Sequence, residues 1–142
     1  MMVKDVMTSN VIITSTETNI KEAAKTLADN HIGSLVVVRN DQPIGILTGR
    51  NILYALAESG SSEEDRVDLK KVGDVMTNYI IPVTPRSGIQ RAVKLMINNK
   101  IKKLPVIDKG NLVGIITASD IISAQSKLIK DIQSLLEGRG RK

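Results

Sequence analysis

Two polar residues three positions apart, Thr117 and Asp120, follow an apolar run and have a spacing that suits ligand chemistry. At a junction between a strand and a helix, this pattern predicts a capping box, in which each side chain accepts a hydrogen bond from the other residue's backbone N–H. The same helix start offers free N–H groups that can meet a phosphate. The pair is therefore compatible with a structural cap or with an anion site.

The composition excludes several classes of catalytic and metal site. The 142 residues include no cysteine and a single histidine, His31. A thiolate nucleophile, a disulfide framework and a cysteine-ligated metal centre are therefore excluded. No carboxylate pair, glycine-rich phosphate loop or metal-ligand spacing is evident, so we expect no catalysis. The lack of cysteine favours a cytoplasmic location.

Membrane insertion and export are not expected from the sequence. The apolar stretches are only a few residues long, far short of the ~20 that a membrane span needs. The N-terminal residues lack the charged start, apolar core and cleavage site of an export signal. We therefore expect a soluble protein without a membrane span.

The net charge of +5 is unevenly distributed. Residues 1–71 carry 8 basic and 10 acidic side chains, residues 72–126 carry 7 and 3, and residues 127–142 carry 5 and 2. Such asymmetry is typical of an anion site in one half and an interaction tail at the end. Nucleic-acid binding is an alternative, but its usual stacking platforms are aromatic, and the chain has only Tyr54 and Tyr79.

The chain contains an internal repeat with an offset of 69 residues. Residues 3–8 (VKDVMT) return as residues 72–77 (VGDVMT), with five of six identical. Eleven of the 37 positions in residues 17–53 are identical to their counterparts in residues 86–122, where chance gives about two at an average usage of ~6%. The sequence is therefore an internal duplication.

Each copy has the predicted element order β-α-β-β-α. Apolar runs at residues 11–13 and 80–81 predict the first strands. Amphipathic helices follow, for which Thr18 and Ser87 are the expected N-caps. In each copy, two later apolar runs around a turn predict a two-stranded hairpin. The hairpin spans residues 35–48 in the first copy and residues 104–117 in the second. A second helix is expected from about residue 49 in the first copy and 118 in the second.

These patterns divide the chain into two copies, a linker and a tail. One copy of about 55 residues would bury only ~60% of its unfolded surface, so we expect the two copies to pack with pseudo-twofold symmetry. The copies are residues 1–57 and 72–126, residues 58–71 form a linker, and residues 127–142 extend the last helix into a basic tail. Gly45 and Gly114, inside predicted strands, indicate a bulge or the close approach of another backbone or a ligand.

The two copies resemble the tandem CBS domain pair, or Bateman module. The residues that carry the resemblance are DVMT at 5–8 and 74–77, KLPVID at 103–108 and GIITASD at 114–120, and it covers residues 1 to about 126. The resemblance implies an α+β fold of two CBS repeats and a regulatory module whose clefts bind AMP, ADP, ATP or S-adenosylmethionine. It also implies a homodimer. Because the sequence contains no attached enzyme, signalling would act in trans on a separate effector protein.

The resemblance places the main nucleotide site at Asp120, which would accept hydrogen bonds from the ribose. Basic side chains before the preceding strand would contact phosphates, and the other copy would supply an apolar slot for adenine. The implied residues are Thr117, Ser119, Asp120, Lys102 and Lys103, with Val11, Ile32 and Gly33 from the first copy.

The first copy departs from this pattern because Asn51 stands where the acid is expected. One amide carbonyl cannot accept both ribose hydroxyls as a carboxylate does, so we expect a weaker second cleft. Arg50 can offset this loss by pairing with a phosphate, and a solvated arginine is the alternative. The implied residues of this cleft are Thr48, Arg50, Asn51, Tyr79, Ile80 and Ile101.

The last predicted helix extends beyond its counterpart in the first copy and ends at Gly138. Its apolar face consists of Ile121, Ile122, Leu128, Ile129, Ile132, Leu135 and Leu136. This face predicts packing across a dimer or on another protein, with a membrane surface as the alternative. Two other functions remain open for the chain: an interaction module with empty clefts, and nucleic-acid binding through the basic tail.

Overall fold

A computed structural model describes residues 1–60, 62 and 66–138 of the chain. The chain divides into two compact units. The first-repeat unit consists of Asn10–Ile81 and Lys109–Leu112, and the second-repeat unit consists of Met1–Ser9, Pro82–Asp108 and Val113–Lys142. The end of the predicted basic tail, residues 139–142, and residues 61 and 63–65 of the predicted linker lie outside the described residues.

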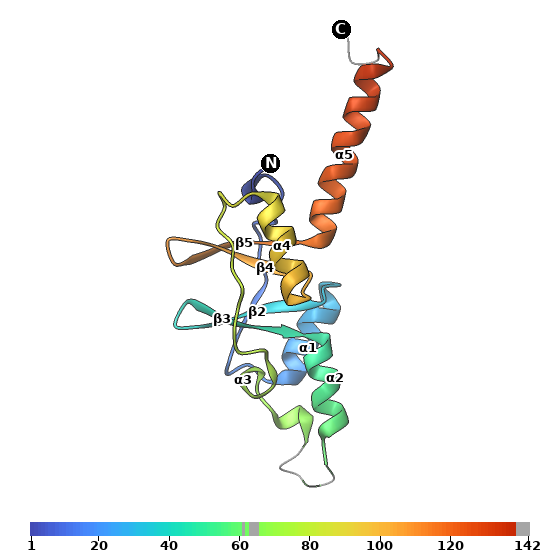
Figure 1. The fold of residues 1–142 in the computed structure, drawn as a ribbon. Coiled ribbons are helices and arrows are strands. Elements are labelled where there is room, and N and C mark those ends of the chain that lie inside the picture. Colours follow the sequence, from blue (N-terminus) through green and yellow to red (C-terminus); the bar gives the residue numbers. More distant parts are fainter. Residues whose placement is uncertain (61, 63–65, 139–142) are drawn as a thin grey trace. The chain divides into compact units, whose positions relative to one another are not determined.

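In its described residues, the first-repeat unit is a three-stranded sheet with three α-helices, of which α3 is a single short turn (Figure 1). Its elements are β1 (Ile13–Ser15), α1 (Ile20–Asp29), β2 (Ser34–Arg39), β3 (Gln42–Thr48), α2 (Gly49–Glu58), the 3-10 turn η3 (Val67–Leu69) and α3 (Val72–Val75). β1 pairs in parallel with β2, which pairs antiparallel with β3. The buried core includes Leu35, Val37 and Leu47 of the sheet and Ile20, Ala23 and Leu27 of α1.

In residues 66–138, which the structure describes, the second repeat lacks a counterpart of β1, so the first strand predicted at residues 80–81 is wrong, and the sheet of this repeat has two strands, β4 and β5. The elements of the second-repeat unit are the 3-10 turn η1 (Val3–Asp5), α4 (Ile89–Asn99), β4 (Lys103–Asp108), all but the first two residues of β5 (Asn111–Thr117), and α5 (Ala118–Leu136). The predicted α+β fold of two repeats with an extended C-terminal helix is confirmed. Where β1 lies in the first repeat, the second has only a single parallel bridge, from Val83 to Val106. Pro85 explains this loss, because a proline has no N–H with which a strand could continue the pairing.

The helices α1 and α4 begin one residue later than the predicted caps imply. Asn19, not Thr18, is the N-cap of α1, and its side chain accepts a hydrogen bond from the Lys21 N–H at 2.8 Å. Gly88, not Ser87, is the N-cap of α4 and provides no side-chain bond. Ser87 instead accepts a hydrogen bond from the Thr84 N–H at 3.1 Å, which stabilises the turn before the helix.

Each unit contains the leading segment of the other repeat, so that the two repeats exchange segments. Thr8 and Ile115 exchange two backbone hydrogen bonds of 2.9 Å in the second-repeat unit. In the first-repeat unit, the N–H of Ile46 donates to the Thr77 carbonyl at 3.0 Å, and the Thr77 N–H donates to the Ile46 carbonyl at 2.9 Å. The boundaries of the two compact units therefore differ from the boundaries of the two sequence repeats.

This exchange explains the glycines inside β3 and β5. A Cβ atom added at Gly114 would lie 2.9 Å from the Thr8 carbonyl oxygen and 2.8 Å from the Met7 sulfur. A Cβ atom added at Gly45 would collide with the Thr77 carbonyl oxygen. The close approach of another backbone is therefore found at both glycines. The bulge that the sequence left as the alternative is also present beside Gly45, because the pairing of β2 with β3 shifts register between Val37 and Val38.

We expect Gly45→Ala to lower the free energy of unfolding by about 1–3 kcal/mol, because the methyl group must displace the exchanged backbone. Gly49→Ala is the matched control, since a Cβ atom there meets no atom of another described part of the chain within 4 Å. Urea unfolding of both variants measures the difference. Equal unfolding midpoints would show that the exchanged segment yields without cost.

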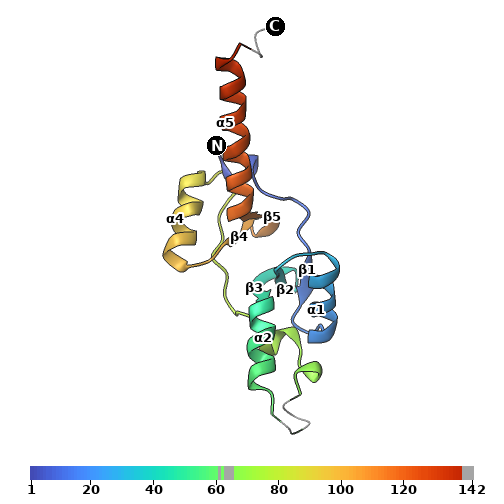
Figure 2. The same ribbon diagram turned by 90° about the vertical axis from the view of Figure 1, so that its right-hand side faces the viewer.

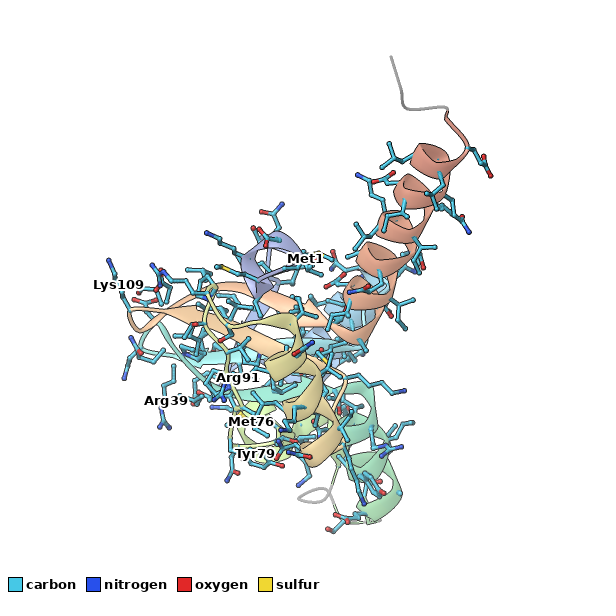
Figure 3. All side chains as sticks on the ribbon, turned by 45° about the horizontal axis from the view of Figure 1, so that its top comes forward. Met1, Arg39, Met76, Tyr79, Arg91 and Lys109 are labelled. Atoms are coloured by element: carbon cyan, nitrogen blue, oxygen red, sulfur yellow. The ribbon has the colours of Figure 1, made fainter. Side chains whose placement is uncertain are left out.

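The outer turns of α5 run away from the rest of the second-repeat unit (Figure 3). Of its apolar residues, only Ile121 is buried, whereas Leu128, Ile129, Ile132, Leu135 and Leu136 are exposed. Gly138 follows the helix with a φ of 81°, and its left-handed backbone agrees with the predicted stop. Within the described residues, no helix is both long enough and apolar enough to traverse a lipid bilayer.

Candidate functional site

The junction between β5 and α5 holds Thr117 and Asp120 in a reciprocal capping box. The Asp120 N–H donates to the Thr117 hydroxyl at 3.0 Å, and the Thr117 N–H donates to Oδ2 of Asp120 at 3.1 Å. Among the described residues, Oδ1 of Asp120 accepts no hydrogen bond. The structural cap is therefore present, and it leaves one carboxylate oxygen available at the start of a 19-residue helix.

Lys103 lies beside this junction at the start of β4. Burial lowers the pKa of the Lys103 ammonium below its ordinary value, and the nearby charge of Asp120 acts in the opposite direction. Lys102 is exposed, and its carbonyl accepts the first N–H of α5, from Ala118, at 2.9 Å. The second-repeat unit thus brings Lys102 and Lys103 to the start of α5, where Ser119 is exposed in the first turn.

The equivalent junction of the first repeat has the same box with an amide. The Thr48 N–H donates to Oδ1 of Asn51 at 2.9 Å, and the Asn51 N–H donates to the Thr48 hydroxyl at 3.0 Å. The amide Nδ2 of Asn51 also donates to the Thr77 hydroxyl at 3.4 Å. Both polar atoms of the Asn51 amide therefore make hydrogen bonds, the oxygen within the cap and the nitrogen to Thr77, whereas Asp120 uses only one of its two carboxylate oxygens in its cap.

The remaining predicted site residues divide between the units. Val11, Ile32 and Gly33, predicted for the Asp120 cleft, belong to the first-repeat unit. Arg50, Tyr79 and Ile80 belong to the same unit as Asn51, and Ile101 belongs to the second-repeat unit. Arg50 and Tyr79 are both exposed, and the Gly33 carbonyl accepts the first N–H of α2 at 3.2 Å.

Comparison with known proteins decides the family. The CBS domain profile matches residues 3–58 and 72–127. The chain belongs to the CBS domain family. The MK0525 protein of Methanopyrus kandleri is 33% identical over 132 residues, which are 92% of this chain and 63% of that protein. The chain thus spans less than two thirds of this relative.

Solved structures of CBS proteins have the same fold. The CBS-domain protein ATU1752 from Agrobacterium tumefaciens superposes with a TM-score of 0.77 at 28% identity, covering 88% of this chain and 99% of that chain. The CBS domain pair of protein MJ0100, in complex with 5′-methylthioadenosine and S-adenosylmethionine, superposes with a TM-score of 0.77 at 27% identity. The superposition with the MJ0100 domain pair covers 89% of this chain and 97% of that chain.

Ser34 in the first CBS repeat was not predicted as a site residue. It is 8% exposed, and among the described residues its hydroxyl has no hydrogen-bond partner. Ser34 pairs with Thr48 across β2 and β3, so the two side chains share one face of the sheet. Lys103 occupies the equivalent position in the second CBS repeat. A serine directly before the apolar residues 35–38 was the available sequence signal.

Proposed function

We propose that this CBS pair is a regulatory module that binds an adenine nucleotide or adenosyl compound at a site centred on Asp120. The observation that carries the proposal is the available Oδ1 oxygen of Asp120, placed at a helix start beside the half-buried Lys103. A carboxylate oxygen can accept a ribose hydroxyl, while lysine and free N–H groups attract a phosphate. The MJ0100 complex supports the ligand class.

The second CBS repeat contributes Thr117, Ser119, Lys102 and Lys103 to this proposed site. Val11, Ile32 and Gly33 of the first repeat are proposed to form the adenine slot. The site around Asn51, with Thr48, Arg50, Tyr79, Ile80 and Ile101, is proposed to be weaker, because its amide atoms already have partners. The module has no catalytic role in this proposal and acts on a cytoplasmic effector protein in trans.

Calorimetric titration with AMP, ADP, ATP, S-adenosylmethionine and NADH tests the proposed function. Saturable binding of at least one adenosine compound is the expected result. If none of the five compounds produces heat at a range of temperatures, the module is not an adenosine sensor. The chain would then act as an interaction module with empty clefts.

We also propose that the module forms a homodimer through its helices. Leu53 on α2 and Ile122 on α5 occupy equivalent positions in the two repeats, and they are 67% and 66% exposed. Ile97 on α4 is also exposed, at 68%. Each unit thus exposes large apolar side chains on its helices, which supports a partner surface on each, because the centres of protein interfaces are poor in charged residues.

Introducing a charge into this surface should separate the proposed dimer. We expect Leu53→Lys and Ile122→Lys each to raise the dissociation constant at least about tenfold, since each would bury an unpaired ammonium in the interface. Ser123→Lys, on the exposed surface of the same helix, is the control. Sedimentation velocity measures the change. An unaltered dimer in both apolar-site variants would place the interface elsewhere, and a monomeric wild type would refute the dimer.

A further inference from the structure

A depression of about 360 Å³ is lined by residues of the first-repeat unit, and its lining includes no residue of the Thr117–Asp120 junction. Tyr54, Ala55 and Glu58 line it from α2, and Lys70, Asp74 and Val75 line it from the segment that leads into and forms α3. In Figure 2, the turn η3 and the short helix α3 are drawn in yellow-green beside α2. Asn51 completes the lining, and the spacing of the α2 residues places them on one helix face.

Three charged side chains of this depression, Glu58, Lys70 and Asp74, have hydrogen-bonding atoms that can still accept or donate. Within the described part of the chain, neither the Glu58 carboxylate nor the Lys70 ammonium makes a hydrogen bond or an ion pair. Asp74 uses Oδ2 to accept the Lys71 N–H at 3.0 Å, which leaves Oδ1 available. Lys71 itself is engaged elsewhere, since its ammonium lies 2.7 Å from Glu17.

The rest of the lining suits a short aliphatic chain that carries a cation. Ala55 and Val75 are half-buried and give an apolar surface for methylene groups. Tyr54 is 62% exposed, and the face of a tyrosine ring attracts an ammonium or guanidinium group. Two carboxylates and one ammonium give the site a formal charge of −1, which repels the phosphates of a nucleotide.

We propose that this depression binds a cationic α-amino acid. Such a ligand has two positive groups for Glu58 and Asp74, one carboxylate for Lys70, and a methylene chain for the apolar surface of the lining. Its net charge of +1 is complementary to that of the lining. The proposal is independent of the adenosine function and shares only Asn51 with the proposed nucleotide sites. A bound amino acid would connect α2 to α3, which is part of the leading segment of the second repeat.

Titration of the ¹⁵N-labelled full chain with L-lysine and L-arginine, followed by NMR, tests this site. Saturable shifts are expected for amides of residues 54–58 and 70–75. Glu58→Gln and Lys70→Gln should each lower the affinity about fivefold, the upper range for an exposed charge pair. Glu22→Gln on α1 and Lys94→Gln on α4, which replace exposed charges outside the depression, should leave the affinity unchanged.

Two simpler compounds test the required chemistry of the ligand. Cadaverine lacks the carboxylate and L-norleucine lacks the side-chain ammonium, so each should bind more weakly than L-lysine. The proposal is wrong if neither amino acid gives saturable shifts, or if Glu58→Gln and Lys70→Gln bind L-lysine as the wild type does. An Asp120→Asn variant that still binds L-lysine would separate this site from the nucleotide site, whatever the outcome for nucleotides.

Discussion

Replacing Asp120 with asparagine should lower the affinity for the adenine nucleotide about tenfold to a hundredfold, the range for losing a hydrogen bond to a charged acceptor. The variant should still fold, because Asn51 already forms the same capping box with Thr48 in the first repeat. The loss would therefore come from the carboxylate. Calorimetry gives the affinity, and the urea midpoint shows whether the cap is intact.

The reciprocal change, Asn51→Asp, is the matched control for this result. It supplies a carboxylate at the first-repeat junction and removes the amide hydrogen bond to Thr77. A stronger first site is expected, together with an unchanged site at Asp120. If Asn51 variants reduce nucleotide binding more than Asp120→Asn does, the main site has been assigned to the wrong repeat.

Lys103→Met should change stability and nucleotide affinity in opposite directions. Burial lowers the pKa of Lys103 in the folded protein, so the charged side chain destabilises the ligand-free fold. This cost is fully present below the folded-state pKa and falls as the pH rises through that value. Methionine removes the buried charge and should raise the free energy of unfolding. It should also weaken binding of a phosphate-bearing ligand about tenfold.

Lys102→Met provides the comparison for Lys103, because Lys102 carries the same charge on an exposed side chain. We expect little change in its unfolding midpoint and a smaller loss of nucleotide affinity. Adenosine, which has no phosphate, should bind both variants as it binds the wild type. Equal effects of the two substitutions on stability and affinity would show that the burial of Lys103 has no role in binding.

The local structure of each repeat could be predicted from the sequence because it depends on neighbouring residues. The Thr117–Asp120 box, the hairpins and the buried face of α1 follow from spacing alone. The Thr48–Asn51 box was not predicted. The exchanged leading segments could not be predicted, because a repeat does not show which copy each segment packs against. Gly45 and Gly114 were the sequence signal for this close approach.

Those parts of the candidate site that depend on the repeat pattern could be predicted from the sequence, and those that depend on packing between distant segments could not. Lys103 and Asp120 are 17 positions apart in the chain, yet the shared repeat pattern places both at one end of a strand pair. The Ser34 hydroxyl, which has no hydrogen-bond partner in the part of the chain that the structure describes, was missed, since this depends on the packing around β2. The depression beside α2 was also missed, because its lining combines α2 with residues 70–75.

The most direct test of the proposed function is an NMR titration of the ¹⁵N-labelled protein with the tightest adenosine ligand found by calorimetry. The amides of residues 117–121 and of Lys102 and Lys103 should shift and saturate with one affinity in the wild type. In Asp120→Asn, the same shifts should require a much higher ligand concentration. Shifts that leave these residues unaffected, or that are identical in the two proteins, would contradict a nucleotide site centred on Asp120.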